Sequence, residues 1–174
     1  MTTTALIVID IQNDYFTGGL WPVHEMDRVA ENAAKALEKA RTEGQKVIFI
    51  RHEALSDEAP FFRPGTEGAE IHPSVAPRDG EPVVLKHRPN SFHETDLHQR
   101  LQDAGVTAVT LVGAMSQMCI DATARAARDL GYDVTVIADA CGAREVSMGD
   151  TTISAPDVHA AFMGALQGAY AEVV

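Results

Sequence analysis

The sequence predicts an α/β fold in which helices cover both faces of a parallel sheet. Apolar, strand-like runs alternate with helical patterns from one end of the chain to the other, which is the order that parallel βαβ units produce. Residues 111–112 and 134–137 are apolar or β-branched at consecutive positions. Such strands present apolar side chains on both faces of a sheet, so both faces need a cover of helices.

Six strand-like runs and four helical segments make up this pattern. We expect the strands near residues 4–10, 46–51, 82–86, 107–113, 133–139 and 169–173. We expect the helices near residues 27–43, 95–104, 118–130 and 155–168. No internal repeat or low-complexity linker interrupts them, so we expect one domain over residues 1–174.

The helix boundaries carry their own signals. One stripe of the first helix is apolar, namely Val29, Ala33, Leu37 and Ala40. This helix is expected to end at Gly44. Before the last helix, Ser154 and Asp157 have the spacing of a capping box. The apolar positions that follow in this helix are Val158, Phe162 and Leu166.

Residues 52–81 form a long segment without a periodic pattern. Its prolines, which prevent much regular structure, are Pro60, Pro64, Pro73 and Pro77. A segment of this length in a compact domain is usually functional. We therefore expect it to form a lid, a pocket wall or a subunit contact.

Composition and charge exclude several classes of function. The 174 residues include 14 Lys and Arg against 25 Asp and Glu, a net charge of −11. Such a surface repels nucleic acid and anionic membranes, so we expect a small-molecule substrate and neither of those partners. The sequence has no signal-like N-terminal segment and no apolar run that approaches the length of a membrane span. Two cysteines make no disulfide framework in a domain of this size, so we expect a cytoplasmic protein with free thiols.

Cys119, together with Asp10 and Lys86, is the strongest candidate for chemistry. Cys119 lies between a strand-like run and a helical pattern, so we expect its thiol at a helix N-terminus, where the helix dipole favours the thiolate. Asp10 and Lys86 each close a strand-like run, and the carboxyl ends of parallel strands meet at the ligand-binding edge of the sheet. Taken singly, each residue also has a structural interpretation: Cys119 as a small buried hydrophobe, Asp10 as a turn-capping residue and Lys86 as a surface cation. Cys141 has no acid or base partner in its segment, and we interpret it as structural.

Three separated motifs give a more specific signal. They are Ile9-Asp10-Ile11-Gln12-Asn13-Asp14, Lys86 in Val-Val-Leu-Lys-His-Arg-Pro-Asn-Ser-Phe, and Gly113-Ala114-Met115-Ser116-Gln117-Met118-Cys119. With these motifs in this order, the chain resembles the isochorismatase-like cysteine hydrolases over nearly its whole length. This superfamily includes nicotinamidases, N-carbamoylsarcosine amidohydrolases and isochorismatases.

The resemblance implies both a fold and a site. The implied fold has three αβα layers with a six-stranded, mostly parallel, Rossmann-like sheet. The implied catalytic residues are Asp10, Lys86 and Cys119. The resemblance also implies an oxyanion hole made by the backbone N–H groups of Met115 and Cys119, and a non-proline cis peptide between Ala114 and Met115.

The chemistry of the three side chains also follows from their types. A carboxylate beside Cys119 can take the thiol proton, and the cationic Lys86 stabilises the thiolate. Attack of the Cys119 sulfur on a substrate carbonyl gives an oxyanion. The nitrogen group then leaves with a proton from Asp10, and a thioester on Cys119 remains. Water activated by Asp10 hydrolyses this thioester. We therefore expect a hydrolase that cleaves the C–N bond of a small amide or carbamoyl compound. The alternatives are vinyl ether hydrolysis, as in isochorismatases, where the cysteine is typically replaced, and a non-catalytic binding module that retains the fold.

We expect no metal and no other cofactor. Nicotinamidases of this superfamily hold a metal through an Asp-x-His pair and a further His, and an alignment by eye puts His52, Ala54 and Phe61 at those positions. One imidazole cannot hold zinc or iron in a stable site. We therefore expect metal-independent activity, with nicotinamide as a poor substrate.

Loop residues are candidates for the substrate pocket and for subunit contacts. We interpret Gln12, Asn13 and Asp14 as support for the strand end that carries Asp10. The pocket candidates are Gln12, Phe16, Trp21, His52, Phe61, His87 and Phe92. The resemblance implies a homo-oligomer, either a dimer or a tetramer. Exposed apolar pairs at Phe61-Phe62 and Val173-Val174 are compatible with such an assembly.

Overall fold

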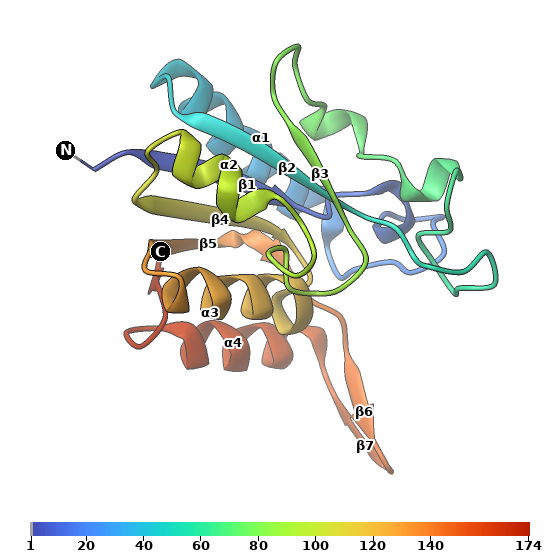
Figure 1. Cartoon of the computed structure of the whole chain (residues 1–174). Coiled ribbons are helices and arrows are strands. Elements are labelled where there is room, and N and C mark those ends of the chain that lie inside the picture. Colours follow the sequence, from blue (N-terminus) through green and yellow to red (C-terminus); the bar gives the residue numbers. More distant parts are fainter. Residues whose placement is uncertain (1) are drawn as a thin grey trace.

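The computed structural model describes residues 2–174 and shows a central parallel sheet between layers of helices (Figure 1). Over these residues the sheet has six strands in the order β3-β2-β1-β4-β5-β8, and each neighbouring pair is parallel. The strands are β1 Thr4–Ile9, β2 Lys46–His52, β3 Val83–Lys86, β4 Ala108–Ala114, β5 Asp133–Gly142 and β8 Glu172–Val173. The predicted fold class is therefore confirmed, while Met1 lies outside the described residues.

Helices cover both faces of the sheet. Within residues 2–174 the α-helices are α1 Met26–Thr42, α2 Leu97–Asp103, α3 Asp121–Asp129 and α4 Ala155–Leu166. Helix α1 packs on one face, and α2, α3 and α4 contribute to the core on the other face (Figure 1). In this described part of the chain, none of the helices combines the length and the apolar character needed to cross a membrane.

Strand β1 shows how the sequence builds two cores. Ala5, Ile7 and Ile9 belong to the core on the α2, α3 and α4 side. Leu6 and Val8 belong to the core on the α1 side. Because successive side chains of a strand point to opposite faces, one continuous apolar run can serve both cores.

The helix signals in the sequence are largely confirmed. The stripe predicted for α1 is buried at each of its four positions, and the chain leaves this helix through Gly44 at φ +67°, a conformation that glycine adopts without strain. At α4, the Ser154 hydroxyl accepts from Asp157 N at 3.3 Å and donates to the Asp157 carboxylate at 2.6 Å. The stripe of α4 is less well predicted, because Phe162 is half-buried and Met163 is buried.

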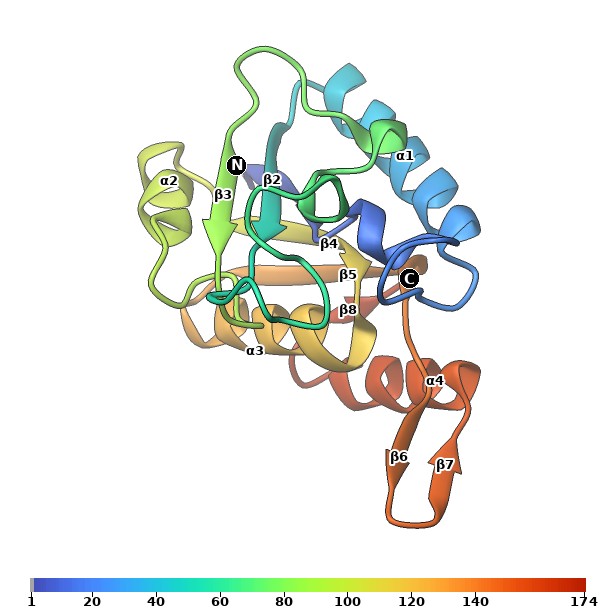
Figure 2. The same cartoon turned by 90° about the vertical axis from the view of Figure 1, so that its right-hand side faces the viewer.

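Several elements differ from the sequence prediction. A π-helical turn, Ser116–Ile120, precedes α3, and β5 continues to Gly142. The last strand shortens to β8, two residues at the sheet edge. The exposed hairpin of β6 Val146–Met148 and β7 Thr151–Ile153 was not predicted, because three-residue strands give no periodic signal. It projects away from the sheet (Figure 2).

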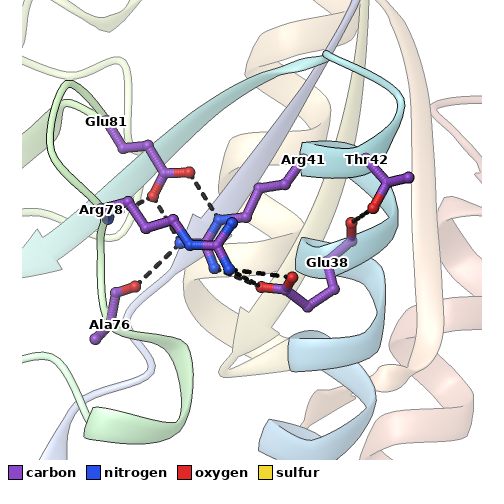
Figure 3. A network of polar contacts seen from close by, with 6 residues as sticks. All are labelled: Glu38, Arg41, Thr42, Ala76, Arg78 and Glu81. Carbon is purple, nitrogen blue, oxygen red and sulfur yellow. Dashed lines mark hydrogen bonds and ion pairs between the residues drawn. The ribbon is translucent and has the colours of Figure 1, made fainter.

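An ion-pair network fixes the end of the long segment 52–81 against α1 (Figure 3). The Arg41 guanidinium donates to Glu81 at 2.7 Å and to the Ala76 carbonyl at 3.0 Å, while Arg78 donates to Glu38 at 2.9 Å. The hydrogen bond from Arg41 lowers the pKa of the Glu81 carboxyl. Because the Arg41 and Glu81 side chains are only 11% and 15% exposed, solvent screens this pair less than an ordinary surface pair. The network thus anchors the chain directly before β3, the strand that ends at Lys86.

Candidate active site

Asp10 follows the last residue of β1 and turns sharply into the core. Its φ is +51°, in the left-handed region, and its backbone N–H donates to the Ile50 carbonyl at 3.1 Å. On the neighbouring strand, a Cβ atom at Gly113 would overlap the Ile9 carbonyl oxygen. Glycine is therefore required there for β1 and β4 to close beside Asp10. A non-glycine residue held at positive φ is typical of functional positions.

The carboxyl ends of β1 and β3 and the turn after β4 bring Asp10, Lys86 and Cys119 together. Lys86 Nζ lies 2.7 Å from Asp10 Oδ2 and 3.3 Å from Cys119 Sγ. The exposed fractions of Asp10, Lys86 and Cys119 are 0%, 1% and 3%. We refer to these residues as the Asp–Lys–Cys cluster. It lies at the carboxyl edge of the parallel sheet, as the sequence predicts.

Cys119 rests as a thiol. It lies within the π-helical turn Ser116–Ile120, two residues before α3 begins at Asp121. Burial, followed by the charge of Asp10, raises the pKa of Cys119 to about 12, although Lys86 acts in the opposite direction. The expectation of a resting thiolate is therefore wrong, because the loss of hydration outweighs the helix end and the ammonium.

Lys86 carries the positive charge of the cluster. Burial alone would lower its pKa, but the attraction to Asp10 and Cys119 gives a pKa above the usual value for lysine. On the other side of this ion pair, Asp10 Oδ1 is buried and has no hydrogen-bond partner among residues 2–174. The cluster therefore offers a fixed cation, a neutral thiol and a carboxylate oxygen that is free to accept a proton.

His52 is in contact with the same ammonium. Lys86 Nζ lies 2.9 Å from His52 Nδ1. Burial, followed by the charge of Lys86, lowers the pKa of His52 to about 4. His52 is therefore a neutral member of this group, and the sequence did not predict this contact with Lys86.

The residues at the metal positions of nicotinamidases do not fit a metal. Ala54 has no ligand atom in its side chain, and Phe61 stacks on Trp21 at a centroid distance of 4.9 Å. Asp10, His52 and Cys119 do offer ligand atoms within 4.8 Å of one another. The Lys86 ammonium, however, lies within 3.3 Å of all three, so a cation already fills this space.

Gln12 and Asp14 support the site from behind. The Gln12 side chain donates to His52 O at 2.8 Å and to Ala69 O at 2.7 Å, and it accepts from His52 N at 2.8 Å. Its amide has both donor hydrogens bonded to the protein, so the structure corrects its assignment as a pocket residue. The Asp14 carboxylate accepts from Phe62 N at 2.7 Å. Both side chains tie the end of β1 to the segment 52–81, in agreement with a supporting role.

Aromatic side chains pack beside the cluster. Tyr15 contacts Phe61 and Phe62 at centroid distances of 6.0 Å and 4.6 Å. Burial, followed by the charges of Cys119 and Asp10, raises the pKa of Tyr15 well above its usual value. Sequence reasoning missed Tyr15, because it lies in a short 3-10 turn without periodicity. Phe62 is 0% exposed, so the expectation of an exposed Phe61-Phe62 pair is wrong: the Phe62 ring fills the core on the α1 side.

Three of the pocket candidates have their contacts elsewhere. Phe16 stacks on His72 at 3.7 Å, and Phe92 stacks on Tyr132 at 6.2 Å. His87 is exposed, and its Nδ1 lies 2.8 Å from the Glu53 carbonyl oxygen. Of the seven pocket candidates, the structure brings His52 into direct contact with the cluster and places Phe61 and Trp21 in the aromatic group beside Tyr15.

Arg144 and Gln117 are polar residues that sequence reasoning did not single out. The Arg144 guanidinium lies over the Trp21 ring at 4.1 Å, and its Nη1 is buried without a hydrogen-bond partner among residues 2–174. Gln117 donates to the Arg144 carbonyl at 3.3 Å, while its own Oε1 is buried and likewise unpartnered within that range. The position of Gln117, two residues before Cys119, could have indicated a place in the site. Arg144 follows β5 in a segment without a periodic pattern, so no such indication exists for it in the sequence.

The turn that carries Cys119 is held by hydrogen bonds. The peptide bond between Ala114 and Met115 is cis. The Met115 carbonyl accepts from Met118 N at 3.0 Å and from Ile120 N at 3.1 Å. The buried Ser116 hydroxyl donates to the Gly142 carbonyl at 3.1 Å and lies 2.8 Å from His159 Nδ1. The turn is therefore fixed from β5 and from α4.

Comparisons with known proteins agree with this fold. The model of the isochorismatase domain family matches residues 4–173. The uncharacterised isochorismatase family protein YddQ of Bacillus subtilis is 48% identical over 171 residues, covering 98% of this chain and 95% of its own length. The crystal structure of a candidate isochorismatase hydrolase from Oleispira antarctica is 52% identical with a TM-score of 0.96, covering 99% of this chain and 93% of that one.

A relative with a named activity is more distant. Streptothricin hydrolase of Streptomyces noursei is 35% identical over 170 residues, which cover 97% of this chain and 58% of that protein. The family match extends over nearly the whole chain and includes the segments that carry Asp10, Lys86 and Cys119. The chain therefore belongs to the isochorismatase family of hydrolases.

Proposed function

We propose that this hydrolase cleaves the C–N bond of a small amide or carbamoyl compound through a thioester on Cys119. The observation that carries the proposal is the Asp–Lys–Cys cluster, in which one buried ammonium lies 2.7 Å from a carboxylate and 3.3 Å from a thiol. The 35% identity to streptothricin hydrolase supports hydrolase chemistry of this kind.

The first half of the reaction forms the acyl-enzyme. Asp10 takes the proton of the Cys119 thiol as Sγ attacks the substrate carbonyl carbon, and the carbonyl oxygen becomes an oxyanion. Backbone N–H groups of Met115 and Cys119 are the donors that we assign to this oxyanion. Asp10 then gives its proton to the leaving nitrogen, the C–N bond breaks, and ammonia or an amine departs.

The second half of the reaction restores the enzyme. Asp10 removes a proton from water as the water oxygen attacks the thioester carbon, and the C–S bond breaks. The departing thiolate takes this proton back, and the acyl group leaves as a carboxylic acid. The free Asp10 Oδ1 supports its role as the proton carrier in both halves. Vinyl ether hydrolysis needs only an acid such as Asp10, and it would leave the Cys119 thiol beside Lys86 without a function.

We further propose that the substrate carries a carboxylate beside its scissile amide. Arg144 Nη1 is buried without a hydrogen-bond partner in the described part of the chain. The neighbouring Gln117 Oε1, which is likewise unpartnered there, is an acceptor and would take an N–H of the same substrate. A buried guanidinium N–H without an acceptor is costly, and a carboxylate satisfies it with a charge-assisted hydrogen bond. Trp21 holds the guanidinium plane by a cation–π contact at 4.1 Å.

The test is a panel of amides, ureas and carbamoylated amino acids scored for ammonia release. Each compound is paired with an analogue in which the carboxylate is replaced by a methyl ester or a hydrogen. We expect turnover of carboxylate-bearing amides by the wild-type enzyme and none by Cys119→Ala. Equal turnover of the paired compounds would refute the proposal that the substrate carries a carboxylate. Turnover by Cys119→Ala would refute the proposed thioester intermediate.

A further inference from the structure

The Lys86 ammonium lies within a cage of three acceptors from three different segments. Its distances are 2.7 Å to Asp10 Oδ2, 2.9 Å to His52 Nδ1 and 3.3 Å to Cys119 Sγ. An ammonium has three N–H donors. Each acceptor therefore takes one of them, and none remains for water or substrate.

The cage fixes the hydrogen position on His52. An imidazole nitrogen that faces an ammonium at 2.9 Å must accept, so the Nδ1 atom is unprotonated and the ring hydrogen is on Nε2. Burial and the charges of Lys86 and His87 lower the pKa of His52, and the charge of Asp10 opposes them, with a result of about 4. At any pH well above this value, His52 remains an acceptor.

His52 is held at its backbone and at its ring. The Gln12 side chain bonds both the backbone N and the backbone O of His52 at 2.8 Å. Phe62 lies against the imidazole at a centroid distance of 5.8 Å. His52 is paired in register with Lys86 across β2 and β3, so the imidazole and the ammonium leave the sheet side by side.

We propose that His52 is a positioning residue for the proposed amide hydrolysis, because it holds the Lys86 ammonium at the distance from which that cation serves both Asp10 and Cys119. The inference rests on the proposed function of the cluster. Without His52, one buried N–H of Lys86 loses its acceptor. The ammonium is then free to move toward Asp10 and away from the sulfur, and the thiolate that forms during attack loses its nearest cation.

The direct test is the protonation state of His52 in the wild-type protein. Nitrogen-15 NMR of the histidine rings, assigned by comparison with His52→Asn, should show an unprotonated Nδ1 and a protonated Nε2 from pH 6 to pH 9. A His52 ring with its hydrogen on Nδ1, or one that titrates with the ordinary pKa of histidine, would overturn the proposal. This result does not depend on knowing the substrate.

The functional test compares His52→Phe with His52→Asn, which retains an acceptor. The readout is the rate of Cys119 alkylation by iodoacetamide against pH, measured by peptide mass spectrometry. We expect His52→Phe to be slower at each pH by about tenfold, the change that one unit of thiol pKa produces. His52→Asn should recover most of this loss. His93→Phe, a change at an exposed histidine beside Glu94, is the control and should match the wild type.

A pocket-wall role for His52 predicts a different pattern. It would leave the alkylation profile unchanged in His52→Phe and alter only the KM for substrate amides, which would overturn our proposal. A protein that passes both the NMR and the alkylation tests but hydrolyses no amide would refute the proposed function and leave the cage intact. The two claims can therefore fail separately.

Discussion

The two cysteines of the chain have the same burial but different neighbours. Cys119 is 3% exposed and Cys141 is 4% exposed, and burial raises the pKa of each thiol to about 12. Cys119 has the Lys86 ammonium at 3.3 Å and the Asp10 carboxylate in the same cluster. Cys141 lies in β5 opposite Gly113, and the charged side chain that acts on its pKa is the exposed Asp139.

This comparison shows that neither burial nor resting pKa identifies a nucleophilic cysteine. Both thiols are protonated at neutral pH. The difference is a fixed cation, which stabilises the thiolate, and a carboxylate oxygen without a partner among residues 2–174, which can accept the thiol proton. The following predictions test whether those two groups account for the whole difference.

The largest expected effect separates the cysteines themselves. Cys119→Ala should reduce turnover of a substrate amide by about a thousandfold or more, since it removes the nucleophile. Cys141→Ala should retain wild-type turnover. Steady-state ammonia release from both variants measures this. The opposite ranking would mean that the nucleophile has been assigned to the wrong cysteine.

The next effect concerns the two acids. Asp10→Asn should lower kcat by about 10²- to 10⁴-fold, the usual contribution of a general acid–base, because both halves of the reaction use this carboxylate. Asp139→Asn, beside the other cysteine, is the matched control and should leave kcat unchanged. Single-turnover kinetics should show slow acylation and slow deacylation in Asp10→Asn. Retention of most activity in this variant would remove Asp10 from the mechanism.

A smaller effect is expected at Arg144. Arg144→Gln removes the charge that we assign to the substrate carboxylate, at a cost of about 1.5–3 kcal/mol for a charged hydrogen bond. The KM for carboxylate-bearing amides should rise by about 10- to 100-fold, since each 1.4 kcal/mol is a factor of ten. The alkylation rate of Cys119 should not change. An equal rise in KM for uncharged analogues would show that Arg144 shapes the pocket without binding a carboxylate.

The pH dependence of alkylation tests the role of Lys86. Because the pKa of Cys119 is about 12, its alkylation rate should rise with pH across the whole range from 7 to 10, without a plateau. Lys86→Met should lower the rate by about tenfold or more at each pH, since removing the cation raises the thiol pKa further. Lys35→Met, at an exposed lysine of α1, is the control. A plateau near neutral pH in the wild type would show a resting thiolate and contradict the account.

The smallest effect is on stability. Cys141→Ala leaves a small cavity in β5 and should lower the free energy of unfolding by about 1 kcal/mol. Urea denaturation measures this change. A larger loss combined with lower activity would indicate that Cys141 supports the turn around Gly142 and is not merely a packing residue.

The meeting of Asp10, Lys86 and Cys119 could be predicted from the sequence for a simple physical reason. Each follows an apolar, strand-like run, and the ends of parallel strands meet at one edge of the sheet. The alternation of such runs with helical patterns predicts the order of the layers in the same way. These are properties of local segments, so the chain displays them directly.

Other features depend on what covers a residue in three dimensions. The pKa of Cys119 follows from burial that no local pattern reveals, so the expected thiolate was wrong. Phe62 lies in a proline-rich segment that reads as exposed, yet its ring is enclosed beside Tyr15. Arg144 stands in an irregular segment, and only the folded chain places it over Trp21. Sequence reasoning finds residues at the ends of regular elements and misses residues that loops bring to the same place.

The most direct test of the central claim is to trap the acyl group. Wild-type enzyme mixed with a substrate amide is quenched in acid during the first turnover, and the peptides that contain Cys119 and Cys141 are weighed by mass spectrometry. We expect the added mass of the acyl group on the Cys119 peptide alone. In Asp10→Asn, the acyl-enzyme should form slowly and then persist, so a larger fraction than in the wild type should remain at late times. An acyl group on Cys141, or hydrolysis at full rate with no acyl group on either cysteine, would contradict the account.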